Sequence, residues 1–466
     1  MYSSLNYASS KNPKYKFLTI FGIKFTLVNI SISKFLLSQT LYNLKKDLHM
    51  EIKYTTQNFT GYDARHLKGL FVSDKRCADA LKRLAKSMEV DIYTPSIASK
   101  SIRKEQNELA SQNKLIWAQD YITVMDTRAI LFDNTRDFLK RTLRASAEGL
   151  SKVLKMPTIK SEPHLRGGNF YICEVNGIKK LLVGDNKANI YPQDLFKQIF
   201  GVEEICALPR LDWHLDLFVR PLDNGNVLVA DYTKTLEGLN KGLENLRKHH
   251  SRTDITQDQK AQLESIIDKL ETEIAKWDIT EKFAQYKPQT TTSEIIKTLT
   301  DSGFNPIPVP GTHYYLEPIK NPNKEKELLN NFASNMQNLK ELAESHSTDI
   351  QHRVKKYIEL KTFEVSQNQN IGIELENLYD NNFINAIVTK NQNGELVYVT
   401  NASLLDRKLG ITPEIEELTG FSTKKMFIES LNPYIKPENI HFIDEKLTEQ
   451  LFKFMGGIHC TAAEII

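Results

Sequence analysis

A glycine pair, a histidine, a cysteine and a short apolar run follow one another in Phe454-Met455-Gly456-Gly457-Ile458-His459-Cys460-Thr461-Ala462-Ala463-Glu464-Ile465. Because glycine has no Cβ, the pair lets the backbone adopt φ > 0 or approach another group closely. A cysteine attacks as the thiolate, a form that a neighbouring imidazole or cation favours. The pattern alone fits an inert buried thiol as well as a nucleophilic Cys460. The choice between the two depends on segments far upstream.

The composition is that of a globular protein. The chain has 466 residues, of which 40% are hydrophobic and 26% charged, enough for one large domain or two or three ordinary ones. A net charge of +3 gives no support for a nucleic-acid partner. The four cysteines, Cys77, Cys173, Cys206 and Cys460, are too sparse for a disulfide scaffold and show no zinc-finger spacing. They indicate a reducing compartment, in which at most one cysteine takes part in chemistry.

Residues 1–49 differ from the rest, with seven lysines against one aspartate and a net charge of +6. Lys24 and Lys34 interrupt the apolar-rich segment 17–37, which therefore lacks the roughly 20 uninterrupted apolar residues that a membrane-spanning helix needs. The basic start resembles a signal peptide but lacks an A-x-A-like cleavage site. We expect a poorly structured or mis-assigned N-terminal extension over 1–49 and no membrane partner. We also expect a cytoplasmic protein, with secretion left open.

From residue 50 onward, strand and helix patterns alternate, which is typical of an α/β fold. Strands are predicted at 69–72, 90–95, 121–125, 170–175, 180–183, 204–208, 213–219, 227–230, 383–388, 396–399 and 441–443. Helices are predicted at 75–88, 136–154, 293–303, 323–360 and 445–454. Asn176-Gly177 and Asn393-Gly394 predict hairpin turns.

The segment 234–283 has a different pattern, in which leucine and isoleucine recur at helical spacing with charged residues between them. It predicts two long amphipathic helices, and Asp254-Ile255-Thr256 between them can cap the second one. We expect a helical hairpin inserted into an α/β body spanning 50–466. The hairpin either binds a partner, acts as a lid or packs on its parent domain.

Polar residues in two further segments suit the chemistry of a nucleophilic cysteine. His214 and Asp216 fall in a predicted strand, where the period of two places both on one face. Asp120 lies at the start of another predicted strand. With Cys460, these residues supply a nucleophile, a general acid/base and two carboxylates. Two carboxylates beside a thiol imply a cationic substrate, and a planar guanidinium binds carboxylates through paired hydrogen bonds.

Four segments resemble, in this order, motifs of the guanidine-modifying (pentein) superfamily, with the peptidylarginine deiminases and agmatine deiminases as the most similar groups: Trp117-Ala118-Gln119-Asp120, Arg166-Gly167-Gly168-Asn169, His214-Leu215-Asp216 and Gly456-Gly457-Ile458-His459-Cys460. The segment 383–388 also resembles an agmatine deiminase strand. The resemblance covers roughly residues 60–466 apart from 234–283. It implies a five-bladed α/β propeller of ββαβ units around the active site.

The resemblance also implies roles for individual residues. Cys460 would be the nucleophile, His214 the general acid/base, and Asp120 and Asp216 the carboxylates that bind the guanidinium. Substrate contacts would also come from Trp117, Arg166 and Asn169. The implied activity is hydrolysis of a guanidinium to a ureido group and ammonia through a covalent cysteine thiouronium. The substrate would be an arginyl peptide or protein, or a small molecule such as agmatine, and no cofactor or metal is implied.

Two other functions stay open at this point. An amidinotransferase would use the same cysteine but pass the amidino group to an amine without releasing ammonia. An inactive propeller would bind guanidinium-bearing partners through the helical arm. We expect a supporting role for His459, because neighbouring residues on a strand point to opposite sides. The same alternation argues against a zinc site that combines His459 and Cys460 with His214 and Asp216.

Overall fold

The computed structural model describes most of the chain beyond residue 66. The described residues are 16–20, 23–27, 67–72, 74–94, 118–120, 122–125, 128–132, 149–150, 152–155, 157–161, 167–184, 193–209, 215–277, 292–311, 382–453 and 456–465, with scattered helical positions between 330 and 358. The chain divides into two compact units, residues 1–57 and 58–466. In the first unit, the described residues form an antiparallel strand pair, β1 (Lys16–Ile20) and β2 (Ile23–Leu27). No helix in the described ranges is long and apolar enough to cross a bilayer.

Three small sheets of the second unit share one topology. In each, an antiparallel hairpin is followed, after a helical connection, by a third strand that runs parallel to the second strand of the hairpin. The sheets are β8 (Phe170–Val175), β9 (Ile178–Gly184) and β10 (Glu204–Leu208); β11 (Val219–Pro221), β12 (Asn226–Asp231) and β13 (Asn305–Pro310); and β14 (Ile387–Lys390), β15 (Leu396–Thr400) and β16 (Ile440–Phe442).

A six-stranded sheet in the order β4-β3-β17-β5-β6-β7 contains the same unit twice. One copy is β5 (Ile122–Met125), β6 (Arg128–Phe132) and β7 (Thr158–Ser161). The other joins distant segments: β17 (Ala462–Ile465) pairs antiparallel with β3 (Gly69–Val72), and β3 pairs parallel with β4 (Asp91–Tyr93). A parallel contact between β17 and β5 connects the two copies. The described residues thus contain five ββαβ units, and the prediction of an α/β chain is confirmed.

The helical connections differ in length from unit to unit. Helix α2 (Lys75–Met88) joins β3 to β4, and its N-cap Asp74 accepts hydrogen bonds from two backbone N–H groups of the first turn. Other connections contain α6 (Gln193–Phe200), α10 (Thr292–Asp301), α13 (Leu404–Leu409), α14 (Pro413–Thr419) and α15 (Thr423–Leu431), and α16 (Glu445–Lys453) follows β16. The helices predicted at 75–88, 293–303 and 445–454 are therefore confirmed, whereas most of the helix predicted at 136–154 lies outside the described residues.

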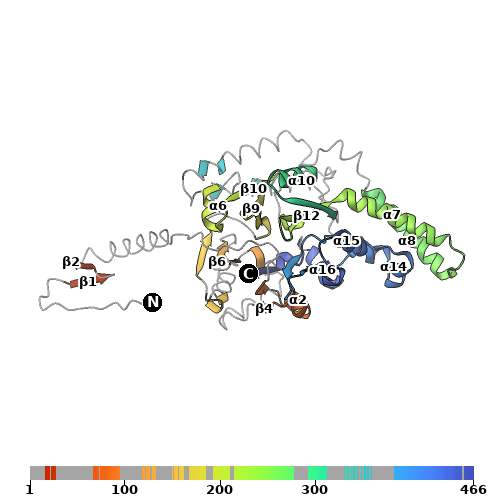
Figure 1. The fold of residues 1–466 in the computed structure, drawn as a ribbon, viewed down its shortest axis with the longest axis horizontal. Coiled ribbons are helices and arrows are strands. Elements are labelled where there is room, and N and C mark those ends of the chain that lie inside the picture. Colours follow the sequence, from red (N-terminus) through yellow and green to blue (C-terminus); the bar gives the residue numbers. More distant parts are fainter. Residues whose placement is uncertain are drawn as a thin grey trace. The chain divides into compact units, whose positions relative to one another are not determined.

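The two helices predicted within 234–283 are present as α7 (Tyr232–His250) and α8 (Gln257–Trp277), drawn in green in Figure 1. Thr256 caps α8 as predicted: its hydroxyl accepts from the Gln259 N–H at 3.2 Å, and its own N–H donates to the Gln259 side chain at 2.9 Å. The apolar sides of both helices pack with buried residues of α13 and α14 and with Phe421. The pair thus packs on the C-terminal part of the same unit.

Two predicted strands are wrong in part. Residues 215–217 form a 3₁₀ turn, η4 (Leu215–Leu217), before β11 begins at Val219. Leu215 and Leu217 are both buried in one apolar cluster, so their spacing resembled a strand although the chain turns there. In the predicted strand 383–388, pairing begins only at Ile387, because the Asn382 side chain accepts the Asn385 N–H at 3.1 Å and holds a turn.

Candidate active site

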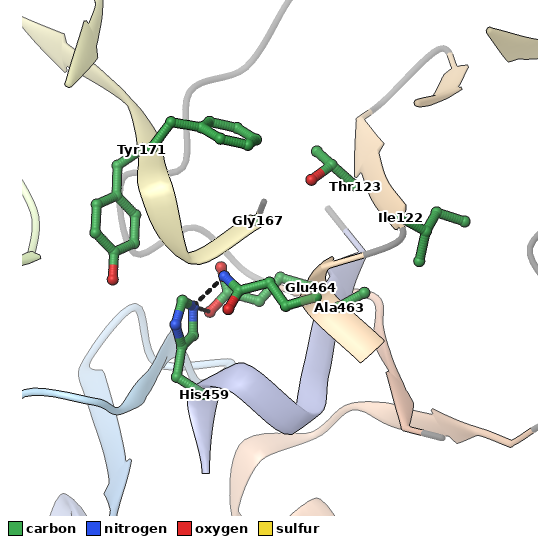
Figure 2. A pocket seen from close by; sticks show the side chains of 9 residues that line it. Ile122, Thr123, Gly167, Tyr171, His459, Ala463 and Glu464 are labelled. Atoms are coloured by element: carbon green, nitrogen blue, oxygen red, sulfur yellow. Dashed lines mark hydrogen bonds and ion pairs between the residues drawn. The ribbon is translucent and has the colours of Figure 1, made fainter. Parts of the chain in front are cut away.

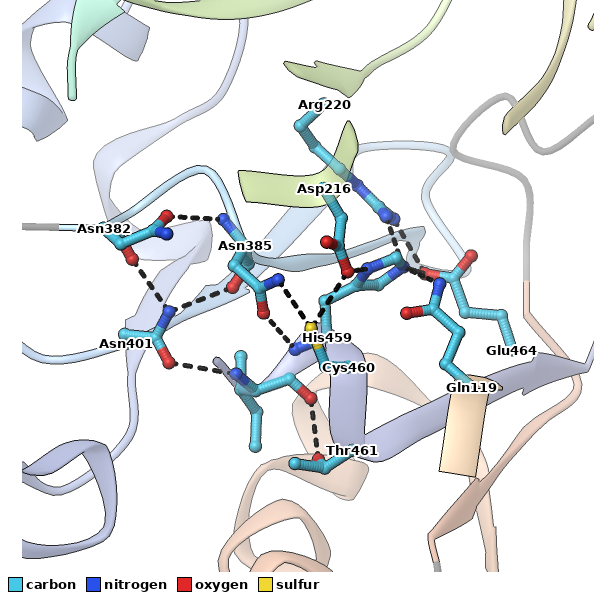
Figure 3. A network of polar contacts seen from close by, with 11 residues as sticks. Gln119, Asp216, Arg220, Asn382, Asn385, Asn401, His459, Cys460, Thr461 and Glu464 are labelled. Carbon is cyan, nitrogen blue, oxygen red and sulfur yellow. Dashed lines mark hydrogen bonds and ion pairs between the residues drawn. The ribbon is translucent and has the colours of Figure 1, made fainter. Parts of the chain in front are cut away.

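The cysteine lies in a 3₁₀ turn, η7 (His459–Thr461), directly before β17. Two buried asparagines hold this turn by its backbone (Figure 3): the N–H of Ile458 donates to Asn401 Oδ1 at 3.0 Å, and the N–H of His459 donates to Asn385 Oδ1 at 2.8 Å. A Cβ at Gly457 would lie 2.6 Å from both asparagine side chains. The glycine is therefore required for close approach, one of the two reasons expected from the sequence.

The sulfur of Cys460 lies between a hydrogen-bond acceptor and a donor. Its thiol donates to Asp216 Oδ2 at 3.2 Å, and the side-chain amide of Asn385 donates to the sulfur at 3.1 Å. Asp216 comes from η4 and is fully buried, as is Asn385, while Cys460 is 3% exposed. The structure thus brings together Cys460 and Asp216, which are 244 residues apart in the chain.

His459 shares the same carboxylate oxygen through its Nδ1 atom, 2.8 Å from Asp216 Oδ2. Its Nε2 atom lies 2.7 Å from Arg220 Nη1 and 3.1 Å from Gln119 Nε2. A guanidinium can only donate, so Nε2 is the acceptor and the imidazole proton is on Nδ1, from which it is donated to Asp216. Both nitrogens are occupied, and His459 therefore orients Asp216.

The supporting role expected for His459 agrees with these contacts, but the reason given for it is wrong. His459 and Cys460 lie in a 3₁₀ turn, where neighbouring side chains do not alternate between two faces. Both side chains contact Asp216. The alternation argument against a shared zinc site fails for the same reason. Among the described residues, no group of three or more histidine, cysteine or acidic side chains is placed to hold a metal ion.

Behind His459 lies a buried ion pair. Arg220 Nη2 donates to Glu464 Oε1 at 2.7 Å, and their side chains are 2% and 3% exposed. Burial alone would raise the pKa of Glu464, but the charge and hydrogen bond of Arg220 hold that pKa at about 2. Burial would lower the pKa of Arg220, but the Glu464 carboxylate raises it above the usual value. Both groups are therefore charged at neutral pH.

These contacts leave the buried cluster with a negative charge. The carboxylates of Asp216 and Glu464 are accompanied by one cation, Arg220, and by a neutral His459, so these four side chains sum to −1. The two carboxylates among these four side chains favour a positively charged group nearby.

A small cavity adjoins the cluster on the Glu464 side (Figure 2). Its lining includes Gln119, Thr123, Tyr171, His459 and Glu464, and the volume open to the centre of a water-sized sphere is about 10 Å³. That is the room of about one water molecule, which is too small for a substrate. The Gln119 Oε1 atom is buried without a hydrogen-bond partner among the described residues, as expected beside such a water site.

The segments that form the site occupy equivalent positions in the five units. Each one precedes the first strand of an antiparallel strand pair: η2 (Ala118–Asp120) before β5, η3 (Gly167–Asn169) before β8, η4 before β11, residues 382–386 before β14, and η7 before β17. The turn η2 packs against η3 and η7, and η3 also packs against η4 and η7. The described parts of the four motifs, which are separate in sequence, therefore meet in space.

The other predicted site residues are described only in part. Asn169 is buried in η3, and the backbone of Asp120 lies in η2. The side chain of Asp120 and the whole of Trp117, Arg166 and His214 lie outside the described residues. Their predicted roles stay predictions.

Sequence reasoning missed Asn385, Arg220, Glu464 and Gln119 as parts of the site. A signal was present for the first three. Asn385 interrupts the apolar run 383–388, and Glu464 and Arg220 stand alone among apolar residues at strand positions. A lone polar group in a buried strand needs a partner, and two isolated opposite charges can supply each other.

Comparisons with protein-family models and with curated proteins find no match for this chain. Among solved structures, it is similar to an agmatine deiminase of C. jejuni, with a TM-score of 0.38 and 13% identity over 88% of this chain and 97% of that chain. It is also similar to ArgZ, an arginine dihydrolase of cyanobacteria, with a TM-score of 0.33 and 9% identity over 85% of this chain and 40% of that chain. Because both TM-scores are below 0.5, residue roles depend on the contacts described above.

Proposed function

We propose that this protein is a deiminase that hydrolyses a guanidinium group to a ureido group and ammonia. The observation that carries the proposal is the contact between the Cys460 thiol and the buried Asp216 carboxylate. A guanidinium is a cation whose N–H groups match carboxylate oxygens. The four motif segments support the same reading.

Substrate binding would prepare the nucleophile. The guanidinium would donate hydrogen bonds to Asp216 and to Asp120. At Asp216 it would replace the hydrogen bond that the Cys460 thiol donates. The thiol proton would be released to water. One positive charge, the proton, is then replaced by another, the guanidinium, and the net charge of the site does not change. The adjacent positive charge then favours the thiolate, the form of Cys460 that attacks.

The reaction would proceed through a covalent intermediate. The Cys460 sulfur forms a bond to the guanidinium carbon, the bond from that carbon to a terminal nitrogen breaks, and His214 supplies the proton with which ammonia leaves. His214 then takes a proton from water, whose oxygen adds to the carbon of the thiouronium. The carbon–sulfur bond breaks, releasing the ureido product and the thiolate. In sum, one guanidinium and one water give one ureido group and one ammonium.

The fold supports this placement of the site. Five ββαβ units, each contributing the segment before its first hairpin strand, are what a five-bladed α/β propeller with a central site requires. We therefore propose that arrangement for the second unit of the chain. The polar residues Gln119, Asn169, Asp216, Asn385 and Cys460 would each come from a different blade.

The test is ammonia release by the purified full chain offered agmatine, arginine, a methylated arginine and an arginyl peptide in parallel. We expect a ureido product and ammonia in equal amounts from one class of substrate. The same protein should gain the mass of one amidine group at Cys460 after treatment with 2-chloroacetamidine, and Cys460→Ala should abolish both results. Transfer of the amidino group to an added amine without ammonia would instead identify an amidinotransferase.

A matched pair of variants tests the role of the carboxylate. Asp216→Asn keeps the shape of the side chain but removes its charge, and we expect ammonia release to fall to background. Asp223→Asn changes an aspartate in the turn after β11 that pairs with Lys390, and it should keep the wild-type rate. If folded protein releases no ammonia from any of the four substrates and forms no adduct with chloroacetamidine, the deiminase proposal is wrong.

A further inference from the structure

Two asparagines hold the nucleophile turn, but the described contacts differ at the sulfur. Asn385 and Asn401 each accept a backbone N–H of the turn, from His459 and Ile458 respectively. Asn385 also donates its side-chain amide to Cys460 Sγ at 3.1 Å, whereas the amide of Asn401 donates to the carbonyls of Asn382 and Asn385 at 2.8 and 3.1 Å (Figure 3). The sulfur contact thus distinguishes two otherwise similar residues.

The orientation of the Asn385 amide follows from its partners. A backbone N–H can only donate, so the side-chain atom facing His459 N at 2.8 Å must be the oxygen. The other atom, which faces the sulfur, is therefore the NH₂ group. The Asn385 backbone is held on both sides, because its N–H donates to the Asn382 side chain and its carbonyl accepts from Asn401. The donor is therefore fixed in place before any substrate arrives.

The Asn385 amide should interact more strongly with the thiolate of Cys460 than with its thiol. As a thiol, Cys460 donates to Asp216 and is a weak acceptor. As a thiolate, it loses that hydrogen bond and lies beside a carboxylate of the same sign, while it becomes a much stronger acceptor. The Asn385 N–H is then the described contact that opposes the repulsion from Asp216.

We propose that Asn385 is a catalytic residue whose amide N–H stabilises the Cys460 thiolate and holds the sulfur in position. It would do so twice in the proposed reaction, before the carbon–sulfur bond forms and again when that bond breaks and the thiolate leaves. This role in turnover rests on the proposed function. The effect of Asn385 on the ionisation of the sulfur does not, and it can be measured without substrate.

The experiment compares Asn385→Asp with Asn401→Asp in the full-length protein. Both substitutions keep the oxygen that accepts a backbone N–H, so they perturb the turn in a similar way, but the first removes the N–H at the sulfur. Ionisation of Cys460 is followed by thiolate absorbance at 240 nm against pH, and the trace of the same protein carrying Cys460→Ser is subtracted. This readout does not require a reagent to enter the buried site.

We expect Asn385→Asp to shift the midpoint upward by about one pH unit or more, which lowers the thiolate fraction about tenfold at a fixed pH below it. Asn401→Asp removes a hydrogen bond to the Asn385 carbonyl but leaves the N–H at the sulfur, so it should shift the midpoint clearly less than Asn385→Asp does. Because a buried aspartic acid can keep its proton and donate to the sulfur, Asn385→Ala is titrated as well and should show the same upward shift. Asn385→Ala also provides the test of the inference if Asn385→Asp does not fold.

Two results would overturn the inference. One is a wild-type midpoint in both Asn385 variants, and the other is an equal shift in Asn401→Asp, which would assign the effect to distortion of the turn. Turnover is measured separately with the substrate that the wild type accepts. A shifted midpoint in a protein that deiminates nothing would uphold the contact between Asn385 and the thiolate and refute the deiminase reaction.

Discussion

Arg220 contributes to the site through the described contacts that it makes with His459 and Glu464. Its guanidinium bridges His459 Nε2 and Glu464 Oε1, at 2.7 Å from each, and the ring of Tyr171 lies 5.3 Å from it. Because His459 receives a hydrogen bond at Nε2, its Nδ1 proton is directed at Asp216, the residue that contacts the Cys460 thiol. Arg220 is thus a positioning residue that acts through His459.

Arg220→Lys should separate charge from geometry. A lysine keeps the positive charge but lacks the planar fork that reaches both partners, so His459 should lose its fixed tautomer. We expect kcat to fall about 10- to 100-fold with a smaller change in KM, because the displaced group acts on the reacting centre. The ¹⁵N shifts of the imidazole report the tautomer directly. Arg247→Lys, which changes an exposed ion pair with Glu271, should change neither kcat nor the tautomer of His459.

Because of Glu464, the free energy of unfolding should depend on pH in the acid range. Its folded-state pKa of about 2 is below the ordinary value of 4.5, so the ionised group contributes stability above pH 4.5. That contribution is lost as the pH falls from about 4.5 toward 2, and a shift of this size corresponds to roughly 3 kcal/mol of unfolding free energy. The measurement is urea unfolding of the wild type and Glu464→Gln at pH 7 and pH 3.

The Glu464→Gln variant should be less stable at pH 7 by about 3–5 kcal/mol, because Arg220 is left buried without its counter-ion. It should also lose less stability than the wild type between pH 7 and pH 3. Equal losses in the two proteins would mean that another carboxylate controls the acid response.

At the level of single elements, the turn that holds Cys460 depends on Gly457. A Cβ there would lie 2.6 Å from Asn385 Oδ1 and from Asn401 Nδ2, so Gly457→Ala should push the turn away from both side chains. We expect a loss of about 1–3 kcal/mol in unfolding free energy and a fall of about 100-fold in kcat. Gly394→Ala is the control: it adds backbone strain at φ +75° in open space and should keep kcat unchanged.

The helical hairpin depends on glycine in a similar way. A Cβ at Gly242 of α7 would lie 2.2 Å from the ring of Phe421, so the side chain of Phe421 packs directly on the helix backbone. Gly242→Ala should therefore lower the unfolding free energy by about 1–3 kcal/mol although alanine favours a helix. Asn240→Ala on the exposed side of α7 should be neutral or slightly stabilising. If Gly242→Ala instead raises the unfolding free energy, the ring of Phe421 is not closely packed on the backbone of α7.

Elements with a regular period were predictable from sequence. The strands at 69–72, 170–175 and 204–208 and the helix at 75–88 have the predicted bounds, because several residues in succession repeat one spacing. The 3₁₀ turns of the site were not predicted. A single turn of three residues has no period, and in η4 two leucines buried on one side resembled an alternating strand.

On the scale of the whole molecule, the site consists of contacts between segments that are from 75 to 340 residues apart. Asn385 contacts Cys460 across 75 residues, Arg220 contacts Glu464 across 244, and Gln119 contacts His459 across 340. The sequence indicated Cys460 and Asp216 because they belong to recognisable motifs. Partners that support them through hydrogen bonds, such as Asn385 and Arg220, could be assigned only once the topology of the five units had placed them.

Strand β17 has two neighbours, β3 on one side and β5 on the other, and it directly follows the turn that holds Cys460. A chain in which this strand is cut away or fails to insert would leave two open edges, each with unsatisfied backbone groups ready to pair with another molecule. The defect that leaves the Cys460 turn without its anchoring strand would therefore also make the protein self-associate. Truncated copies should be recovered as aggregates, and a dissolved form should not accumulate beside the wild type.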